Sequence, residues 1–206
     1  MRCFFYQRRV DPMAPLQKTY FDSFRKVVKA INSTLDLQEV MDLMVKSLVE
    51  VMGVKAAAIR LLNPKKRTLE LLASHGLSDK YIRKGPLDAS RSIAEAMQGK
   101  VVVLSDARRD PRAQYQSQAS EEGIATIVSV PLNLKGRIIG VLRLYTGSPK
   151  EFSEEELDFA QSLAEMGAIA IENARMYERI KKDYESIINE THSIGMIKSM
   201  FRKEEE

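Results

Sequence analysis

Two pairs of apolar runs constrain the fold of this chain more than any other feature. Residues 126–132 and 137–146 are rich in Val, Ile and Leu, and a connection of four residues separates them. A second pair of runs, 56–62 and 69–73, flanks a turn that begins at Asn63-Pro64. Such pairs predict β-hairpins, whose strands run antiparallel. The centre of the fold is therefore expected to be an antiparallel sheet.

The strand predicted over 137–146 presents two different faces, because successive side chains of a strand point to opposite sides of the sheet. One face is predicted to carry Ile139, Val141, Arg143 and Tyr145. The other face is predicted to carry Gly140, Leu142 and Leu144.

Helical patterns precede and follow the hairpins. Apolar residues recur at steps of three and four over 20–31. Asp36 and Glu39 are placed to cap the start of a second helix. Ser153 and Glu156 form a capping box at the start of a last helix, which is expected to run for roughly 40 residues.

Shorter elements are expected between the two hairpins: helices over 90–97 and 113–122, and a strand over 101–104. Helices before and after an antiparallel sheet predict an α+β fold, with a central antiparallel β-sheet, flanking helices and long N- and C-terminal helices that form a dimer bundle. The predicted divisions are a flexible arm (1–18), an N-terminal helix (19–32), one domain (33–176) and a helical extension with a frayed tail (177–206). Met1 and Met13 both remain possible translation starts.

Charge and cysteine content narrow the partners. The net charge is +4, and much of the excess lies in residues 1–18, which contain Arg2, Arg8, Arg9 and Lys18 against Asp11. A basic arm without a basic face argues against a nucleic-acid partner. No apolar run approaches the ~20 residues that cross a bilayer, so no membrane partner is expected.

The single cysteine, Cys3, cannot form an internal disulfide, which fits a reducing cytoplasm. The two histidines, His75 and His192, are too few for a His/Cys zinc cluster, so no metal site is expected. The sequence therefore predicts a cytoplasmic protein without a bound metal.

Several motifs together resemble the signature of GAF domains. They are residues 121–132 with 139–144, the loop 106–112 (similar to D-x-x-x-D-P-R), the segment 152–157 followed by 168–174, and the opening 35–40. The resemblance covers about residues 33–176. It implies a cytoplasmic module that senses ligands or dimerises, with a pocket between a central antiparallel sheet and the helices and loops of the middle of the domain.

Departures from the motifs of the family exclude some of its known ligands. The Asn-Lys…Phe…Asp-Glu pattern of cyclic-nucleotide GAF domains is absent, which argues against cyclic nucleotides. Bilin-binding relatives attach the chromophore through a cysteine in the middle of the domain, and the methionine-sulfoxide reductase branch needs several cysteines. Because Cys3 is the single cysteine, neither a covalent bilin nor that reductase activity is expected, and the cofactor stays unknown.

A ligand pocket in the position that the resemblance implies is predicted to be lined by residues of the middle of the domain: Ile93, Met97, Leu104, Asp106, Tyr115 and Ile127. No catalytic residue is assigned, because Gly-rich phosphate loops and nucleophile motifs are absent.

Three polar features have both a functional and a structural reading. His75 is read as the end of a strand in preference to a ligand contact or proton switch, and His192 as an exposed helix residue in preference to a phospho-acceptor. The charged loop with Asp106, Arg108 and Asp110 is read as helix capping and internal pairing in preference to an anion site.

The last helix carries two apolar stripes. One is predicted to face its own sheet: Leu157, Ala160, Ala164, Ala168 and Ile171. The other, here called the seam, alternates steps of four and three, as in a coiled coil: Phe159, Leu163, Met166, Ala170, Asn173, Tyr177, Ile180, Tyr184, Ile187, Thr191 and Ile194. The part from Met166 to Ile187 is predicted to pair two copies of the chain. In the alternative, the first helix folds back and covers the seam within one chain.

The sequence therefore predicts a small-molecule sensor and signal-transduction module, non-enzymatic, that acts as a homodimer through its terminal helices. A separate signalling protein is a possible further partner. The alternative is a ligand-free dimerisation or adaptor domain that docks such a partner. An enzyme and a DNA-binding protein are weaker alternatives.

Overall fold

The computed structural model describes residues 15–34, 36–90 and 93–202, and the side chains of that part from residue 19 to residue 188. The helices are α1 (Pro15–Ser33), α2 (Leu37–Met52), α3 (Asp79–Ile82), α4 (Gln116–Glu121) and α5 (Glu154–Arg202), with a short 3-10 turn, η1 (Ala96–Gln98). The strands are β1 (Ala56–Asn63), β2 (Thr68–His75), β3 (Leu87–Asp88), β4 (Val102–Leu104), β5 (Ile127–Leu134) and β6 (Arg137–Tyr145).

A single antiparallel sheet has the strand order β3-β2-β1-β6-β5-β4. Both predicted hairpins are present, as β1–β2 and β5–β6. The first strand of one hairpin pairs with the second strand of the other, with Ala57 opposite Leu144. This non-local pairing joins the two hairpins into one sheet and places β1 and β6 at its centre.

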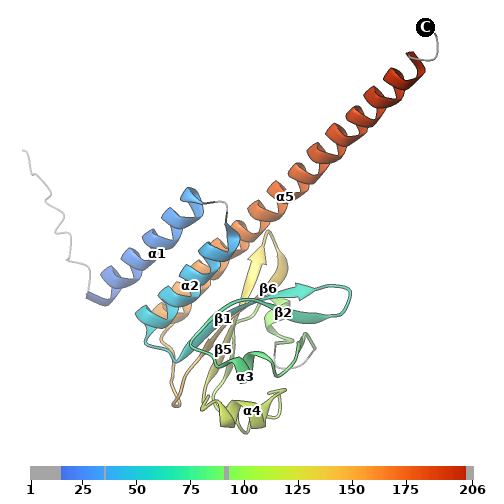
Figure 1. Ribbon diagram of the computed structural model, residues 1–206. Coiled ribbons are helices and arrows are strands. Elements are labelled where there is room, and N and C mark those ends of the chain that lie inside the picture. The colour runs from blue at the N-terminus through green and yellow to red at the C-terminus, as the bar shows by residue number, and fades with distance from the viewer. Residues whose placement is uncertain (1–14, 35, 91–92, 203–206) are drawn as a thin grey trace, which may run out of the picture.

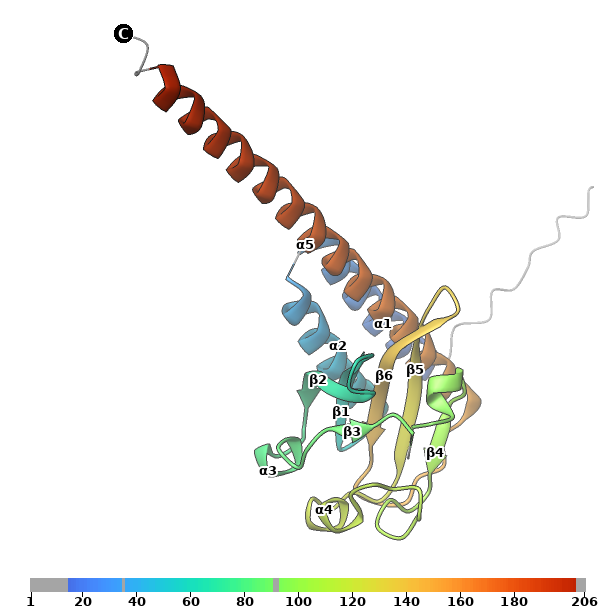
Figure 2. The same ribbon diagram turned by 90° about the vertical axis from the view of Figure 1, so that its right-hand side faces the viewer.

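Two buried clusters lie on opposite faces of the sheet. On one face α1, α2 and α5 pack as a layer of long helices, with Met44, Leu142 and Leu144 in the cluster beneath them. On the other face the short α3, α4 and η1 and their loops cover a second cluster, which includes Ile93 and Tyr145 (Figures 1 and 2). The fold is α+β, as predicted.

The predicted helix caps account for where the long helices begin. The carboxylate of Asp36 accepts hydrogen bonds from the backbone N–H groups of Gln38 and Glu39, at 2.9 and 3.2 Å. At the start of α5, Glu156 N–H donates to Ser153 Oγ at 3.2 Å, and Ser153 N–H donates to Glu156 Oε2 at 3.0 Å. These bonds satisfy backbone donors that a helix N-terminus leaves free.

Several boundaries differ from the sequence prediction. Helix α1 begins at Pro15, inside the predicted arm, because proline is well suited to the first helical position. The helix predicted over 90–97 is only the η1 turn at Ala96–Gln98, with residues 91–92 outside the described part. The helix predicted over 113–122 is shorter, and α3 and β3 were not predicted, since elements of two to four residues carry no periodic signal.

One residue of β6 departs from the predicted alternation. Ile139 is the extra residue of a β-bulge, because Leu132 lies opposite Gly140 whereas Asn133 lies opposite Ile138. Ile139 therefore packs in the cluster under the long helices, whereas Val141 and Tyr145 belong to the cluster on the other face.

Helix α5 is one continuous helix of 49 residues, about 70 Å long at 1.5 Å per residue. Its first part packs on the sheet through the predicted stripe, of which Leu157 is half-buried and the others are fully buried: Ala160, Ala164, Ala168 and Ile171. Its second part projects beyond the domain (Figures 1 and 2). The frayed tail that was predicted falls on residues 203–206, outside the described part.

Candidate functional site

The structure brings five of the six predicted pocket residues together on the sheet face that α3 and α4 cover. Ile93, Leu104 and Ile127 are buried in that cluster, and Met97 and Tyr115 pack against it. These residues come from η1 and its approach, β4, β5 and the loop before α4, and the pairing of β4 with β5 places Leu104 opposite Ile127.

Asp106, the sixth residue predicted for the pocket, is paired within its own loop, as the preferred structural reading of that loop predicts. Its carboxylate accepts hydrogen bonds from the backbone N–H of Arg108 at 3.1 Å and from Arg108 Nε at 2.7 Å. The hydrogen bond from the Arg108 side chain holds the pKa of Asp106 below its usual value. Asp110 is paired with Arg112 in the same way, at 2.7 Å. The carboxylates of the charged loop 106–112 are thus paired with arginines of the same loop.

Polar side chains lie on the same sheet face, beneath the pocket residues. Arg143 of β6 lies opposite Ser129 of β5 and Ala58 of β1. Arg60 of β1 lies opposite Val141, two residues before Arg143, so the two arginines are diagonal neighbours on one face. Tyr145 follows Arg143 on that face, and the Arg143 guanidinium carbon lies 5.6 Å from the Tyr145 ring centre. Both arginines are only 2% exposed.

These buried groups lack hydrogen-bond partners within the described part of the chain. The atoms concerned are Arg60 Nε and Nη2, Arg143 Nε, Ser129 Oγ and the Tyr145 hydroxyl. Buried polar atoms are nearly always hydrogen-bonded, and a buried charge without a partner is costly. Each unpaired donor here therefore needs an explanation.

A third cation, Lys84, lies over the same cluster. Its ammonium donates to the Tyr81 carbonyl oxygen at 3.0 Å and lies 3.5 Å from the Tyr81 ring centre. Burial first, and then the charges of Arg60 and Arg143, lower the pKa of Lys84 to about 7. The Lys84 ammonium therefore loses its proton at a lower pH than the ammonium of an exposed lysine does.

Little negative charge faces these cations. Glu122, after α4, acts against the lowering of the Lys84 pKa. Its carboxylate accepts hydrogen bonds from the backbone N–H of Ser78, at 2.8 Å, and from the Ser78 hydroxyl. Glu122 thus binds Ser78, the N-cap residue of α3, and its charge is shared with that partner. The cluster therefore carries an excess of positive charge.

A small, partly closed space lies beside Arg143, and we call it the chamber. Arg60, the diagonal neighbour of Arg143, is not among the residues of its wall. The volume of the chamber is about 10 Å³, near the lower limit for one water molecule. Its walls come from the α3–β3 segment, the loops around α4 and the sheet: Tyr81, Lys84, Leu87, Ala107, Ala113, Gln114, Tyr115, Ala119, Ile127 and Arg143.

Two loop segments close the chamber. The Tyr115 hydroxyl donates to the Pro86 carbonyl oxygen at 2.8 Å, and Gln114 Nε2 donates to the same oxygen at 3.3 Å. The backbone N–H of Asp88 donates to Gln114 Oε1 at 2.9 Å. Gly85 has a φ of +120°, and a Cβ there would lie 2.8 Å from the Tyr115 hydroxyl, so glycine allows the close contact.

Sequence reasoning missed the arginines, although a signal was present. Arg60 and Arg143 are charged residues inside otherwise apolar strands, at positions that face the core. A charge in such a position is rarely buried without a partner and is a functional candidate. Lys84 carries no such signal, because it lies in a loop whose fold over the sheet is set by tertiary contacts.

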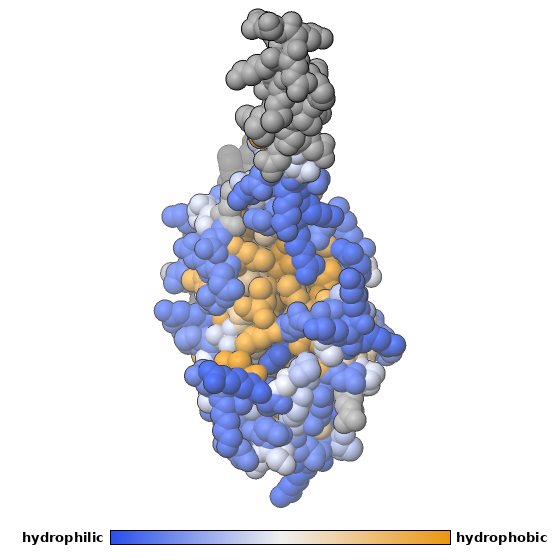
Figure 3. All heavy atoms as spheres, turned by 45° about the vertical axis from the view of Figure 1, so that its right-hand side comes forward, coloured by the Kyte–Doolittle hydropathy of each residue, from blue (hydrophilic) through white to orange (hydrophobic). Residues whose placement is uncertain are grey.

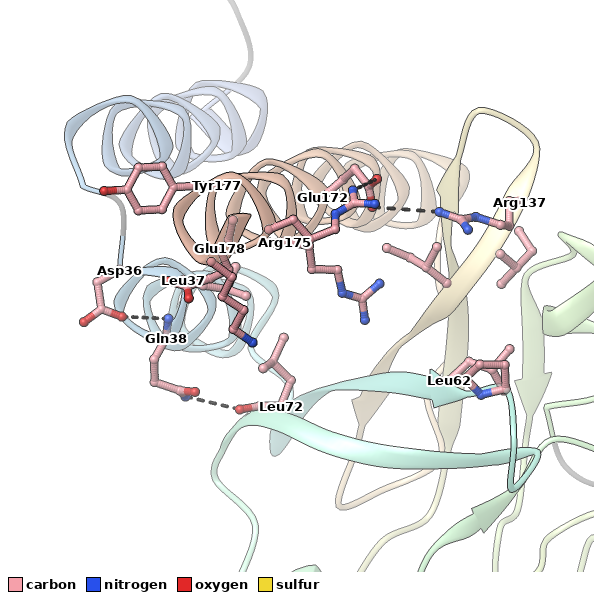
Figure 4. A pocket seen from close by; sticks show the side chains of 16 residues that line it. Asp36, Leu37, Gln38, Leu62, Leu72, Arg137, Glu172, Arg175, Tyr177 and Glu178 are labelled. Atoms are coloured by element: carbon pink, nitrogen blue, oxygen red, sulfur yellow. Dashed lines mark hydrogen bonds and ion pairs between the residues drawn. The ribbon is translucent and has the colours of Figure 1, made fainter. Parts of the chain in front are cut away.

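A separate groove lies on the other side of the sheet, beside α5. It encloses about 1070 Å³ between the start of α2, the tips of both hairpins and α5. Figure 3 shows an apolar hollow with a hydrophilic rim on this side, and Figure 4 shows the rim, where Glu172 faces Arg137 at 3.8 Å. Leu37, Leu62 and Leu72 lie along it.

The seam of α5 is divided by burial. Phe159, Leu163 and Ala170 are buried within their own chain, and Tyr20 of α1 stacks on Phe159. Ala170 is 7% exposed and so is not available to a partner as predicted, and Met166 is half-buried. Asn173 is exposed. From there the seam is open to solvent, with exposed fractions of 48% for Tyr177, 62% for Ile180, 64% for Tyr184 and 62% for Ile187.

The two histidines and the acidic residues form no further site in the described part of the chain. His75 is exposed at the end of β2, and the side chain of His192 lies outside the described part. Across the described residues, no three His, Cys, Asp or Glu side chains gather in a way that could hold a metal ion. No helix in the same part of the chain is long and apolar enough to span a membrane.

Comparison with known proteins agrees with this geometry. Residues 34–172 match the family model described as GAF domain. The formate hydrogenlyase transcriptional activator of Salmonella typhimurium (strain SL1344) is 26% identical over 179 residues, which cover 82% of this chain and 26% of that protein. This chain therefore spans about a quarter of the length of that relative.

Solved structures share the fold. The GAF domain of an Acinetobacter phosphoenolpyruvate-protein phosphotransferase superposes with a TM-score of 0.66 at 25% identity, covering 80% of this chain and 97% of that one. The GAF domain of the corresponding protein from Coxiella burnetii gives a TM-score of 0.71 at 21% identity, covering 81% and 99%.

Proposed function

This chain belongs to the GAF domain family, and we propose that it is a small-molecule sensor that acts as a homodimer through α5 and passes its signal to an effector. The relation of α5 to the sheet carries this proposal. The first part of α5 packs on the sheet face opposite the chamber, and the second part exposes the rest of the seam. One rigid element thus joins a candidate input to a candidate output.

The input is the chamber and the buried cluster beneath it. Buried donors without a protein acceptor, next to a small space, are groups that a ligand with acceptor atoms can satisfy. A ligand alters the protein only if it binds one arrangement better than another. Because Leu142 and Leu144 flank Arg143 and pack toward the long helices, a shift of β6 on binding would reach α5 directly.

The output is the exposed seam. Tyr177, Ile180 and Tyr184 are spaced at three and four residues, which is the spacing that pairs helices in a coiled coil. Each such side chain gains ~1.5–3 kcal/mol on full burial, so pairing two copies of α5 is favourable. In this proposal the sensor is non-enzymatic and cytoplasmic, and binding changes how the paired helices are arranged.

The relatives support a regulatory role. The Salmonella relative is named a transcriptional activator, and the solved neighbours are GAF domains of phosphotransferase proteins. By analogy, we infer that the effector is a signalling or regulatory protein, on the same chain or separate.

The alternative is a ligand-free adaptor, in which α5 and the groove dock a partner and the chamber stays empty. The small volume of the chamber, about 10 Å³, favours this alternative. A binding screen separates the two functions, since an adaptor is stabilised by no small molecule.

Two measurements on the full chain test the proposal. Light scattering is expected to give a mass twice the 23.4 kDa of one chain. Ile180→Lys with Tyr184→Lys is expected to give the single-chain mass, whereas Ser186→Lys, a substitution of an exposed residue on another face of α5, is expected to keep the dimer. A thermal-shift screen of amino acids, nucleotides, sugars and small acids tests sensing. A single-chain mass for the wild type contradicts the dimer, and a screen without any stabilising compound contradicts the sensor.

A further inference from the structure

We propose that the chamber binds a small oxyanion, a carboxylate or an inorganic oxyanion, through Arg143 in its wall and Arg60 beside Arg143. This inference rests on the proposed sensing function and names the chemical class of the ligand. Both guanidinium groups are 2% exposed, come from adjacent central strands and face the same side of the sheet.

The unpaired donors indicate which kind of chemical group the ligand must carry. Arg60 Nε and Nη2 and Arg143 Nε have no hydrogen-bond acceptor in the described part of the chain. A guanidinium donates and never accepts, so its partner must bring acceptor atoms. Carboxylates and other oxyanions supply two or more acceptor oxygens in a geometry that matches the guanidinium fork.

The charge of the cluster indicates the sign of the ligand. Lys84 lies above the arginines, and its pKa is lowered because burial and the two guanidinium charges disfavour its protonated form. Glu122, the acidic group that acts on Lys84, is bonded to Ser78. An anion in the chamber would relieve the repulsion among the three cations, whereas a neutral or cationic ligand would not.

Two neutral hydroxyl groups near the arginines could also donate hydrogen bonds to an oxyanion. Ser129 Oγ and the Tyr145 hydroxyl are also buried without a partner in the described residues, and Ser129 lies directly opposite Arg143. A hydroxyl can donate to an oxyanion at the same time as a guanidinium does. The site therefore contains charged and neutral donors together, as anion-binding pockets do.

The size of the chamber limits the ligand. A volume of about 10 Å³ holds little more than one water molecule in the closed form. Even the smallest oxyanions, of three to five non-hydrogen atoms, therefore require the chamber to widen, and a nucleotide requires far more widening. Entry requires the segments around Pro86 and Tyr115 to separate, and the bonds from Tyr115 and Gln114 to the Pro86 carbonyl oxygen are the ones that break.

The test measures anion binding to the full chain by calorimetry and thermal shift. The probes are formate, acetate, nitrate and phosphate, each as the sodium salt, at an ionic strength held constant with sodium gluconate, whose anion would require far more widening of the chamber. Formamide and acetamide are the neutral controls of matching shape. At least one of these anions is expected to stabilise the protein in a saturable way. Comparing formate and acetate with nitrate and phosphate shows whether the site prefers carboxylates or inorganic oxyanions.

Variants locate the binding to the chamber. Arg60→Met and Arg143→Met are expected to weaken the binding of the active anion at least tenfold. Arg143→Lys keeps the charge and serves if a methionine variant does not fold; it is expected to bind more weakly because the two-point contact is lost. Arg83→Gln removes an exposed arginine from the loop beside Lys84 and is expected to bind as the wild type does.

Three results overturn this inference: no anion of the panel binds, formamide or acetamide stabilises as well as the matching carboxylate, or all arginine variants bind with unchanged affinity. If neutral compounds from the broader screen bind while anions do not, the sensing function stands and its anionic ligand is rejected. The dimer mass is measured separately, so failure of the dimer is distinguishable from failure of the anion site.

Discussion

Tyr20 of α1 stacks on Phe159 of α5, with ring centres 4.5 Å apart and ring planes inclined by 13°. The contact brings the N-terminal helix back onto the first part of the last helix. It explains why the seam of α5 is covered at one end and exposed at the other. The two explanations of the seam, coverage by α1 and pairing with a second copy, are therefore compatible. The first applies to the start of α5 and the second to its exposed part.

Removing the Phe159 ring is expected to destabilise the domain by about 3 kcal/mol, since truncation of a buried aromatic side chain leaves a cavity. Urea denaturation of Phe159→Ala measures this change in the free energy of unfolding. The matched control is Phe21→Ala, because Phe21 lies on the same helix as Tyr20 but is 53% exposed. Its effect is expected to stay within about 0.5 kcal/mol. Equal losses in the two variants would contradict the described packing of α1.

The centre of the sheet has no room for a side chain at Gly140. A Cβ there would lie 2.2 Å from the carbonyl oxygen of Arg60 on the neighbouring strand. Gly140→Ala is therefore expected to destabilise the fold by about 3 kcal/mol, because two paired strands must move apart. Gly147→Ala is the control, since its Cβ would meet the nearest atoms at 3.7 Å, an ordinary contact, and its effect is expected to be below about 1 kcal/mol. Thermal unfolding of both variants measures the two losses of stability. Equal losses would contradict the close contact at Gly140.

Local signals in the sequence predicted most of the fold. The hairpins, the caps at Asp36 and Ser153 and the buried stripe of α5 each depend on residues close together in the chain. The helix expected over 90–97 was wrong because a short apolar pattern does not distinguish a helical turn from an irregular loop. The bulge at Ile139 was missed since a single inserted residue leaves the composition of a strand unchanged.

The candidate site was predicted only in its apolar part. The family resemblance implied the pocket, and Ile93, Leu104 and Ile127 lie in one buried cluster. Of the predicted lining, however, only Tyr115 and Ile127 are in the wall of the chamber. The juxtaposition of Arg60 and Arg143 depends on the pairing of β1 with β6, which lie some eighty residues apart in the chain. No local pattern encodes that pairing, so the polar part of the site became visible only in the structure.

Replacing Arg60 by an apolar residue of similar length is expected to stabilise the ligand-free protein. Arg60→Met removes a buried charge whose Nε and Nη2 have no partner in the described part, and methionine fills comparable space. The expected gain is about 1–2 kcal/mol in the free energy of unfolding. Chemical denaturation without added anions measures it. A loss of several kcal/mol would instead mean that the guanidinium holds the sheet together.

The stability of the ligand-free protein is expected to rise with pH between about 7 and 9.5. Burial and the neighbouring arginines lower the folded-state pKa of Lys84 to about 7, whereas an unfolded lysine titrates near 10.5. In that interval the unfolded chain binds more protons than the folded one, so raising the pH favours folding. The range stops below 10, because buried Tyr81 has a raised pKa and acts in the opposite sense above that value.

Lys84→Met is the matched variant for this pH dependence. It is expected to flatten the slope between pH 7 and 9.5 and to be more stable than the wild type near pH 8. Thermal melts across the range, in one buffer system of constant ionic strength, measure both effects. A slope that persists unchanged in Lys84→Met would assign the titration to another group.

Binding of a small oxyanion is expected to weaken as the pH rises from 7 to 9. Lys84 faces Arg60 and Arg143 on the sheet, Tyr81 and Tyr115 on the covering segments, and Glu122 beyond them. An anion added to this set favours the protonated ammonium, so the pKa of Lys84 rises on binding and a proton is taken up. The dissociation constant then increases by up to about tenfold per pH unit over this range.

Calorimetry in two buffers of different ionisation enthalpy detects the proton uptake directly. At pH 8 the apparent binding enthalpy is expected to depend on the buffer in the wild type and to lose that dependence in Lys84→Met. That variant is also expected to bind more weakly at pH 7, because it lacks the third cation. Binding that stays equally tight from pH 7 to 9 would show that Lys84 does not face the anion, and would restrict the site to Arg60 and Arg143.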